Sequence, residues 1–330
     1  MIHPTVRCLA GVMLLVLAMP ARAQHSAQLS DWPVRPVRLI VPFPPGGAND
    51  IAARLVSQKL AERWRRAVVV DNRGGAGGSI GTEMGARSAP DGYTLTIGST
   101  STLSSNVSLL PGLPFDPVRD FAPIAMLTTA PYVLIVHPSV AASSMQEFIQ
   151  LAKKSPGKLN YSSFGEGSSA HLVVEMFKSM AGVDIVHVPY KGGGPALAAV
   201  VGGEVQMTFG NLGVVLQQVQ AGRVKGLAVS GSRRAVVLPQ IPTVAESGIP
   251  EFEATAWVGL FGPRALTRSL VQKIHRDVGE ILADAEMRKQ VIARGMEPGD
   301  LTPEALGRHV STDIERWRKV IKAAGIQVQP

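Results

Sequence analysis

Two segments in which an apolar strand runs through a glycine-rich turn into a helix constrain this chain most. Residues 41–54 read VPFPPGGANDIAAR, and residues 68–82 read VVVDNRGGAGGSIGT. The first backbone N–H groups of a helix have no partner within the helix, and they lie at the positive end of its dipole. Two such helix starts, close together in the chain, indicate an anion site built from backbone.

Short apolar runs alternate with amphipathic segments along most of the chain, which predicts an α/β fold with mainly parallel sheets flanked by helices. The predicted strands are 38–42, 67–70, 93–98, 132–136, 159–163, 185–188, 205–209, 226–230 and 257–261. The predicted helices include 50–64, 144–153, 168–181 and 194–201, followed by two long ones at 267–293 and 302–324. No repeat of solenoid length is present.

Two stretches indicate crossings between domains. Ala130-Pro131 precedes one apolar strand, and a turn at 247–251 precedes another. The segment between them has its own strands and helices, so one domain is predicted to be inserted into the other through a two-segment hinge. The predicted division is a first domain from 24–130, an inserted domain from 131–250, and a return to the first domain from 251–330.

The N-terminus is typical of an exported protein. Residues 1–23 contain Arg7, an apolar run at 9–18, and the small-residue ending Ala21-Arg22-Ala23, which predicts a signal peptide cleaved after Ala23 and a periplasmic location. A permanent membrane anchor is the alternative, but the apolar run is far shorter than the roughly 20 residues that span a bilayer. Cys8 is the chain's only cysteine, so the mature protein must fold without disulfides.

The formal net charge of +8 does not indicate a nucleic-acid partner. Lys and Arg are scattered, and the densest group, at 63–66, lies at a predicted helix end, where cations favour the dipole. We interpret that group as a solvated helix terminus. Aromatic residues make up only 5% of the chain, which leaves few platforms for stacked bases. A mildly basic protein instead favours encounter with small anions.

In the first glycine-rich turn, the prolines stiffen the strand exit and the glycines allow a ligand to approach the backbone, while Asn49 or Asp50 can cap the helix. An ordinary tight loop is the alternative. The second turn holds four glycines in five residues, at 74–78. Its spacing does not fit the dinucleotide fingerprint and no Walker lysine follows, so no nucleotide cofactor is predicted.

The inserted domain contains a similar pair of helix starts. Residues 162–171 lead from a strand into a helix with hydroxyl groups at its start, and residues 188–195 repeat the arrangement beside Lys191. Simple capping by Ser168 or Ser169 is the alternative for the first of them. Four such starts, two in each domain, favour a ligand site in the cleft between the domains.

The sequence gives little indication of catalysis. The histidines, at 3, 25, 137, 171, 187, 275 and 309, show no metal-ligand spacing, so no metal is predicted. His171 is the one histidine expected near a ligand, with a structural role as the alternative. No Gly-x-Ser-x-Gly elbow is present. We expect a binding protein and not an enzyme; a periplasmic hydrolase or transferase using Ser168 or His171 is the competing hypothesis.

Taken together, these segments resemble the Bug-type periplasmic solute receptors of tripartite tricarboxylate transport systems, over essentially the whole mature chain. The resemblance is carried by Trp32-Pro33, 36–43 (PVRLIVPF), 45–50 (PGGAND), 72–78 (NRGGAGG), 90–94 (PDGYT), 120–124 (DFAPI), 165–172 (GEGSSAHL), 188–192 (VPYKG) and 241–248 (IPTVAESG).

The resemblance implies a type II-like periplasmic binding protein that closes on a small carboxylate, without a cofactor, and delivers it to a membrane transporter or a membrane sensor. One ligand carboxylate is then expected at Pro45, Gly46, Gly47, Asp50, Gly75, Ala76, Gly77 and Ser79. The rest of the solute is expected at Ser99, Thr100, Ser163, Gly165, Ser168, His171, Tyr190, Lys191, Gly192 and Asn211.

The chain departs from the family pattern at two places. Many relatives carry an aspartate in the turn where this chain has Gly210-Asn211, and the loss of that negative side chain is expected to disfavour a ligand with an amino group and to favour a plain or multiply charged acid. Thr267 is followed by Arg268 where relatives often have Thr-Pro, and this second change is expected to lie away from the site.

Overall fold

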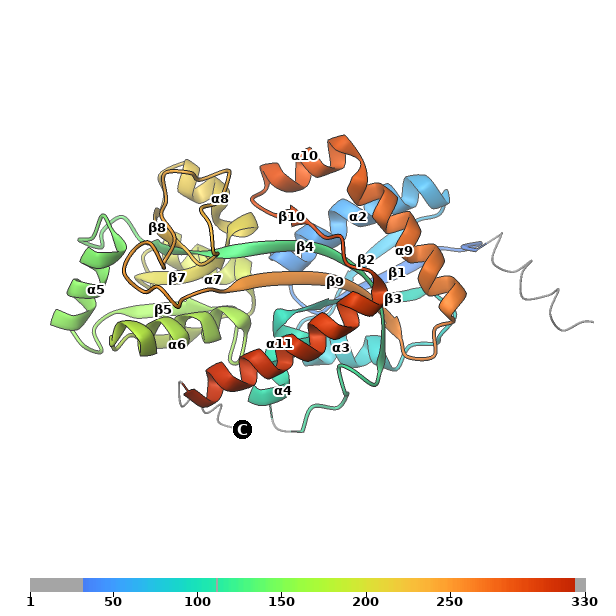
Figure 1. Ribbon diagram of the computed structural model, residues 1–330, viewed down its shortest axis with the longest axis horizontal. Coiled ribbons are helices and arrows are strands. Elements are labelled where there is room, and N and C mark those ends of the chain that lie inside the picture. Colours follow the sequence, from blue (N-terminus) through green and yellow to red (C-terminus); the bar gives the residue numbers. More distant parts are fainter. Residues whose placement is uncertain (1–31, 111, 324–330) are drawn as a thin grey trace, which may run out of the picture.

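The computed structural model describes residues 32–110 and 112–323. Two lobes, each a sheet flanked by helices, lie side by side and are joined by two long strands, β4 and β9 (Figure 1). The predicted signal peptide, 1–23, lies outside the described residues. Among the described helices, none combines the length and the apolar character needed to cross a membrane.

The first lobe is built around three parallel strands. They are β1 (Val37–Val41), β2 (Val68–Asn72) and β3 (Thr94–Ser99), with β1 in the middle. Helices α2 (Ala48–Trp64) and α3 (Ser79–Ala86) provide the connections. Because the strands are parallel, the glycine-rich turns after β1 and β2 emerge at the same edge of the sheet.

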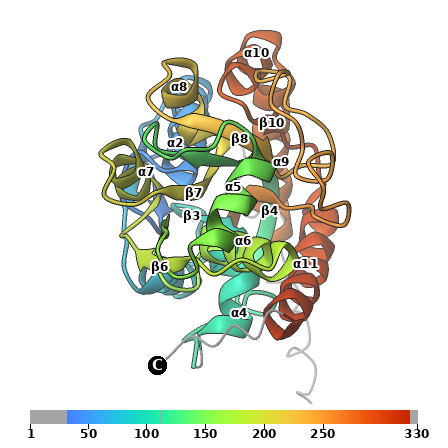
Figure 2. The same ribbon diagram turned by 90° about the vertical axis from the view of Figure 1, so that its left-hand side faces the viewer.

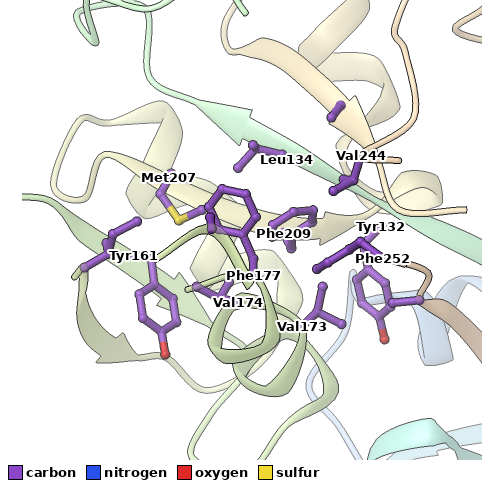
Figure 3. Packing of buried hydrophobic residues seen from close by; sticks show 14 of the residues in the cluster. Tyr132, Leu134, Tyr161, Val173, Val174, Phe177, Met207, Phe209, Val244 and Phe252 are labelled. Atoms are coloured by element: carbon purple, nitrogen blue, oxygen red, sulfur yellow. The ribbon is translucent and has the colours of Figure 1, made fainter. Parts of the chain in front are cut away.

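The second lobe repeats the arrangement. Its parallel strands are β5 (Asn160–Ser163), β6 (Val186–Pro189) and β7 (Met207–Asn211), with β5 in the middle. Helices α6 (Ser169–Ala181) and α7 (Gly193–Val201) connect them. Phe209 packs between Phe177 and Phe252 in the core of this lobe (Figure 3), with ring centroids 5.5 and 5.7 Å away.

The two crossing strands run antiparallel to their neighbours. Strand β4 (Phe121–Val136) pairs with β9 (Thr255–Pro263) through Pro131 and with β7 and β8 (Lys225–Val229) from Tyr132 onward. One strand leaves the first lobe and the other returns, so they oppose each other. The parallel sets are therefore as predicted, while the crossing strands make each sheet mixed. The partner change in β4 falls beside the predicted boundary at 130.

The remaining elements flank these sheets. They are η1 (Ala76–Gly78), η2 (Thr100–Ser105), α4 (Asn106–Leu109), α5 (Met145–Lys154), α8 (Leu212–Gln220), α9 (Arg268–Ala283), α10 (Ala285–Ala293), β10 (Glu297–Pro298) and α11 (Pro303–Ala323). The prediction of one helix over 267–293 was wrong. Asp284 adopts extended dihedral angles, and its side chain accepts a hydrogen bond from the Met287 amide, which ends α9 and starts α10.

The last helix does not belong to one lobe. Leu306, Val310 and Ile314 of α11 pack in a cluster with first-lobe aromatic rings, whereas Trp317 and Ile321 join the core of the second lobe. Both views show α11 extending past the crossing strands toward α6 (Figures 1 and 2). At about 1.5 Å per residue, a helix of this length outreaches a single lobe. Helix α11 thus contacts both lobes, and the assignment of 251–330 to the first domain stays a prediction.

The end of α2 is fixed to α9 through Asp277, a carboxylate that is only 6% exposed. It accepts hydrogen bonds from the Trp64 indole (2.7 Å), the Arg63 guanidinium (2.8 Å) and the Lys273 ammonium (2.9 Å). The interpretation of 63–66 as a solvated terminus was wrong for Trp64, which is buried, whereas Arg63, Arg65 and Arg66 are exposed. Burial by itself would raise the pKa of Asp277, but the three donors outweigh it and the pKa is lowered.

Replacing this carboxylate should destabilise the first lobe. We expect Asp277→Asn to lower the free energy of unfolding by about 1–3 kcal/mol, because charged hydrogen bonds are lost and buried donors remain. The folded-state pKa lies below the ordinary value, so the contribution is present at neutral pH and disappears as pH falls through the folded pKa. Urea unfolding of both proteins at neutral and acidic pH measures this. Glu280→Gln, which removes only the exposed partner of Arg63, is the control, and an equal loss there would contradict the expectation.

Candidate ligand-binding site

A cavity lies between the lobes, and both lobes and one crossing strand contribute to its wall. The lining residues are Phe43, Gly47, Ala48, Asn49, Ser99, Thr100, Ser101, Phe164, Ser169, Gly193, Asn211, Ala256, Trp257 and Val258. Its volume is about 40 Å³, measured as space for the centres of water molecules. On that measure one water needs roughly 10–15 Å³, so the cavity is small and the lobes stand close together.

Direct contacts between the lobes show the same closure. The Ser101 hydroxyl oxygen, in η2 of the first lobe, accepts a hydrogen bond from the Ser169 amide at 2.9 Å and donates to the Ser169 hydroxyl at 3.0 Å. The Ser105 hydroxyl donates to the Gly167 carbonyl oxygen at 3.4 Å. Ser101, Ser105 and Ser169 are all buried. The side of the cavity formed by η2 and α6 is therefore held by the protein's own hydrogen bonds.

Helix α2 presents an uncapped N-terminus to the cavity. Its N-cap is Gly47, which has no side chain to accept a hydrogen bond from the first turn. The amides of residues 48–50 have no intrahelical acceptor, and Gly47, Ala48 and Asn49 all line the cavity. The Asn49 side chain is turned to Ser99, whose hydroxyl oxygen lies 3.3 Å from its Nδ2. This helix start can bind an anion through main-chain N–H groups.

Asp50 supports the same turn from behind. Its carboxylate accepts hydrogen bonds from the Gly46 amide (3.0 Å), from Arg54 (2.9 Å) and from Asn72 (3.0 Å). The Asn72 amide group also donates to the Phe43 carbonyl oxygen at 2.9 Å. Burial would raise the pKa of Asp50, but its donors outweigh burial and lower it. Asp50 therefore fixes the turn and is itself outside the cavity wall.

Two helices of the second lobe also begin at the cavity without a side-chain cap. Helix α7 follows Gly192, which has a φ of 118°, and helix α8 follows Asn211, whose side chain makes no capping hydrogen bond. A Cβ atom placed on Gly47 would lie 3.9 Å from the Gly193 nitrogen. The positive ends of α2 and α7 thus face each other across the closed cavity, an arrangement that an anion between them would stabilise.

The second glycine-rich turn and the helix after it pack closely against their neighbours. A Cβ on Gly78 would lie 2.7 Å from Thr102, one on Gly81 would collide with the Arg73 carbonyl oxygen just after β2, and one on Gly85 would collide with Thr96 of β3. The Gly77 carbonyl oxygen accepts a hydrogen bond from Asn106 at 3.0 Å. These glycines let α3 pack tightly against the sheet and η2. Their turn lies outside the cavity wall.

The start of α6 is occupied by the protein itself. Ser168 is its N-cap and accepts a hydrogen bond from the His171 amide, the Ser169 amide is bound to Ser101, and the Gly167 amide donates to His171 Nδ1 at 3.1 Å. With those amides satisfied, this helix start has little capacity left for a ligand. Ser169 lines the cavity, while Ser168 and His171 lie behind it.

His171 belongs to a stack that the sequence did not reveal. Its ring lies 4.0 Å from that of His187 in β6, at an interplanar angle of 7°, and Glu166 offers an oxygen within 4.8 Å of both. Burial lowers the pKa of His171 and lowers that of His187 to about 3, so both rings stay neutral. His171 Nδ1 accepts a hydrogen bond, which leaves the proton on Nε2, and parallel rings do not direct their lone pairs at one ion. The group is therefore better described as packing than as a metal site.

The other ligand-binding residues predicted in the second lobe lie at the ends of β5 and β6. Ser163 lies 2.6 Å from His187 Nε2, Gly165 turns with a φ of 130°, and the Tyr190 hydroxyl donates to Glu204 at 3.1 Å. Lys191 is exposed. None of these four is in the cavity wall.

Of the residues predicted from sequence, Gly47, Ser99, Thr100 and Asn211 are brought together in the wall. The predicted residues placed outside it are Pro45, Gly46, Asp50, Gly75, Ala76, Gly77, Ser79, Ser163, Gly165, Ser168, His171, Tyr190, Lys191 and Gly192. Asn49 and Ser169, which the sequence indicated only as possible helix caps, also line the wall. The wall residues that were not predicted from sequence are Phe43, Ala48, Ser101, Phe164, Gly193, Ala256, Trp257 and Val258. Phe43 and Phe164 each follow a strand within three residues of a glycine that starts the turn, a signal that could have found them.

Two lobes joined by paired crossing strands, with a cavity at their meeting edges, define a two-domain solute-binding receptor of the periplasmic type. Residues 52–326 match the family described as tripartite tricarboxylate transporter family receptor, and the chain belongs to that family. Protein BugT of Bordetella pertussis is 35% identical over 324 residues, covering 98% of this chain and 99% of that one. The resemblance noted from sequence is thereby confirmed.

Solved structures agree with the fold. The structure of Rpa4515 of R. palustris with adipate has a TM-score of 0.88 and 36% identity, covering 90% of this chain and 99% of that one. The structure of the periplasmic binding protein BugD has a TM-score of 0.86 and 32% identity, covering 90% of this chain and all of that one. The predicted α/β binding-protein fold is confirmed.

The hydrogen bond between Ser101 and Ser169 should hold the lobes together without a ligand. We expect Ser101→Ala to expose the Ser169 amide and to speed its hydrogen exchange at least about tenfold, because about 1.4 kcal/mol of closure free energy corresponds to that factor. Hydrogen exchange resolved to α6, in the ligand-free protein, measures this. Ser104→Ala is the matched control, because the Ser104 hydroxyl is buried nearby without a hydrogen-bond partner among the described residues. Equal exchange in the two variants would contradict the role of Ser101.

Proposed function

We propose that this protein is an exported receptor that captures a small carboxylate between its lobes and delivers it to a membrane transporter of the tripartite tricarboxylate type. The observation that carries the proposal is the pair of glycine-capped helix starts, α2 and α7, that face each other across the cavity. Rpa4515, a close structural relative, was solved with adipate, which is a carboxylate.

The carboxylate is proposed to bind at the start of α2 when the lobes close. A helix N-terminus contributes about 0.3–1 kcal/mol to an adjacent anion when exposed, and a hydrogen bond to a charged group contributes about 1.5–3 kcal/mol. A few such bonds in a space closed to bulk water are enough for the roughly 8 kcal/mol of micromolar affinity. An open cleft would leave the anion in water, so affinity depends on closure.

Delivery requires that the partner distinguish the loaded receptor from the empty one. A ligand that contacts both lobes binds the closed arrangement better and shifts the population toward it. We propose that transporter subunits recognise the closed pair of lobes, that residues 1–23 are removed during export to the periplasm, and that the domains comprise 24–130 with 251–330 and the inserted 131–250.

The groups in the wall favour binding without turnover. The Thr100 hydroxyl oxygen accepts a hydrogen bond from the Trp257 amide at 3.0 Å, and Ser101 and Ser169 are bonded to each other. No histidine is among the described wall residues, so no hydroxyl there has a base beside it. We therefore propose that the cavity releases its solute unchanged.

Carboxylates should stabilise the protein and their amides should not. We expect at least one acid among small mono-, di- and tricarboxylates to raise the melting temperature, since a ligand at 100 times its Kd adds about 2.7 kcal/mol of stability. The corresponding primary amides, which keep the shape without the charge, serve as controls. Thermal melts across the panel, followed by calorimetric titration, measure this. A panel in which no acid shifts the melt overturns the proposal.

A carboxylate supplied by the protein should replace the ligand. Gly47 has a φ of −84° and a ψ of 171°, which any residue can adopt, and the nearest atom to a new Cβ is 3.9 Å away. We expect Gly47→Asp to cap α2, to raise the melting temperature of the ligand-free protein, and to weaken carboxylate binding at least about 100-fold, a change of roughly 2.7 kcal/mol. Gly47→Ala, which adds a methyl group without an acceptor, should bind within a few-fold of the wild type. Unchanged affinity in Gly47→Asp would place the anion elsewhere.

A further inference from the structure

We infer that the acid carried by this receptor has an apolar body, aliphatic or aromatic, with no ammonium group and at most one further oxygen group. This inference rests on the proposed function, because it assumes that a carboxylate binds at the start of α2. It follows from the rest of the cavity wall, whose side chains offer large apolar surfaces and very few unused polar groups.

Aromatic rings approach the cavity from both lobes. Phe43 follows β1 in the first lobe, Phe164 follows β5 in the second, and Trp257 lies on the crossing strand β9. Each phenylalanine ring sits over a glycine beside a helix start. A Cβ on Gly78 would lie 3.1 Å from Phe43, and one on Gly193 would lie 3.6 Å from Phe164. A solute whose charge is held between the helix starts therefore has apolar rings on both sides of its body.

Trp257 offers the solute only its ring. Its main-chain N–H donates to Thr100, and its indole N–H donates to Asp313 of α11 at 2.8 Å. Both of its hydrogen-bond donors are thus used within the protein. Its neighbours in the wall, Ala256 and Val258, add further apolar surface.

An ammonium group on the solute would lack a counter-charge. No acidic or basic side chain is among the described residues of the wall. Two carboxylates lie behind the wall: that of Asp50 is already bound to Arg54, Asn72 and the Gly46 amide, and that of Asp313 accepts the indole hydrogen bond of Trp257. The positive helix ends that attract a carboxylate also repel a cation. Burying an unpaired ammonium group there costs more free energy than the other contacts of an amino acid supply.

A body with many hydroxyl groups would also be disfavoured. The hydroxyl of Ser99 lies beside the Asn49 amide group, and those of Thr100, Ser101 and Ser169 take part in hydrogen bonds within the protein. Asn211 is the exception, because its side chain lines the cavity, is only 6% exposed, and lies beside the buried Tyr132 hydroxyl, which uses only part of the hydrogen-bonding capacity of the amide group. One further oxygen atom of the solute could pair with it, whereas a chain of hydroxyl groups would be buried without partners.

Matched pairs of acids test the inference. 3-Phenylpropanoate and phenylalanine differ by an ammonium group, adipate and 2-aminoadipate differ in the same way, and hexanoate and gluconate differ by hydroxyl groups. We expect the plain acid to bind at least about tenfold more tightly in every pair that binds, measured by calorimetric titration at one salt concentration. If an amino acid or polyol binds as well as its partner, the inference is wrong while carboxylate binding stands. If no acid of any pair binds, the proposed function fails as well.

Replacing one phenylalanine tests whether the aromatic rings of the wall cause the preference for acids with an apolar body. We expect Phe164→Asn, which replaces an apolar ring by a polar amide, to reduce the ratio of affinities between the two acids of a matched pair at least about fivefold. Phe164→Leu, which keeps an apolar side chain, should preserve that ratio. Melting temperatures of both variants show whether each is folded. Undiminished discrimination in a folded Phe164→Asn variant, with Phe43→Asn behaving in the same way, would overturn the assignment of these rings.

Discussion

The closed structure depends on an electrostatic constraint at the meeting of two helix starts. Helices α2 and α7 each begin at a glycine and neither has a side-chain cap, so their unpaired amides are directed into one small space. Parallel strands produce this arrangement in each lobe, because their helices all begin at the same edge of the sheet. Closure brings two partial positive charges together, and an anion converts that unfavourable contact into a favourable one.

Polar side chains around this space fall into two groups with different tasks. Asp50 and Asn72 hold the turn that carries Gly47. The lowered pKa of Asp50 keeps its carboxylate ionised at neutral pH. Ser101 and Ser169 hold the lobes to each other and close the start of α6. The wall that remains is uncharged and largely apolar. The groups in the wall that can attract an anion are therefore main-chain N–H groups.

Periodicity predicted most of the fold because the inner strands, such as β1 and β7, are almost wholly buried and most helices are buried on one face. The nine predicted strands all overlap observed ones, and the crossing at Pro131 coincides with a change of strand partner. The first half of β4 and the break at Asp284 were missed. Pro123 near the start of β4 disfavours a strand, because proline cannot donate a ladder hydrogen bond. A single aspartate inside a helical period gives no local sign that it will cap a new helix.

The site was less predictable for physical reasons. A glycine that allows a tight turn looks the same in sequence as one that admits a ligand, so Gly75 and Gly77, which have positive φ, were grouped with Gly47 in the cavity wall. Ser168 is the extended N-cap of α6 and accepts a hydrogen bond from the His171 amide, whereas Ser169 begins the helix and lines the wall. The pairing of Ser101 with Ser169 joins two residues from different lobes, and no local pattern records it.

Helix α11 limits how the two lobes can move relative to each other. Because this helix packs on both lobes and is tied to the crossing strand through Asp313 and Trp257, it restricts the directions in which the lobes can separate. The empty receptor then samples fewer relative orientations, and capture of a solute costs correspondingly less rigid-body entropy.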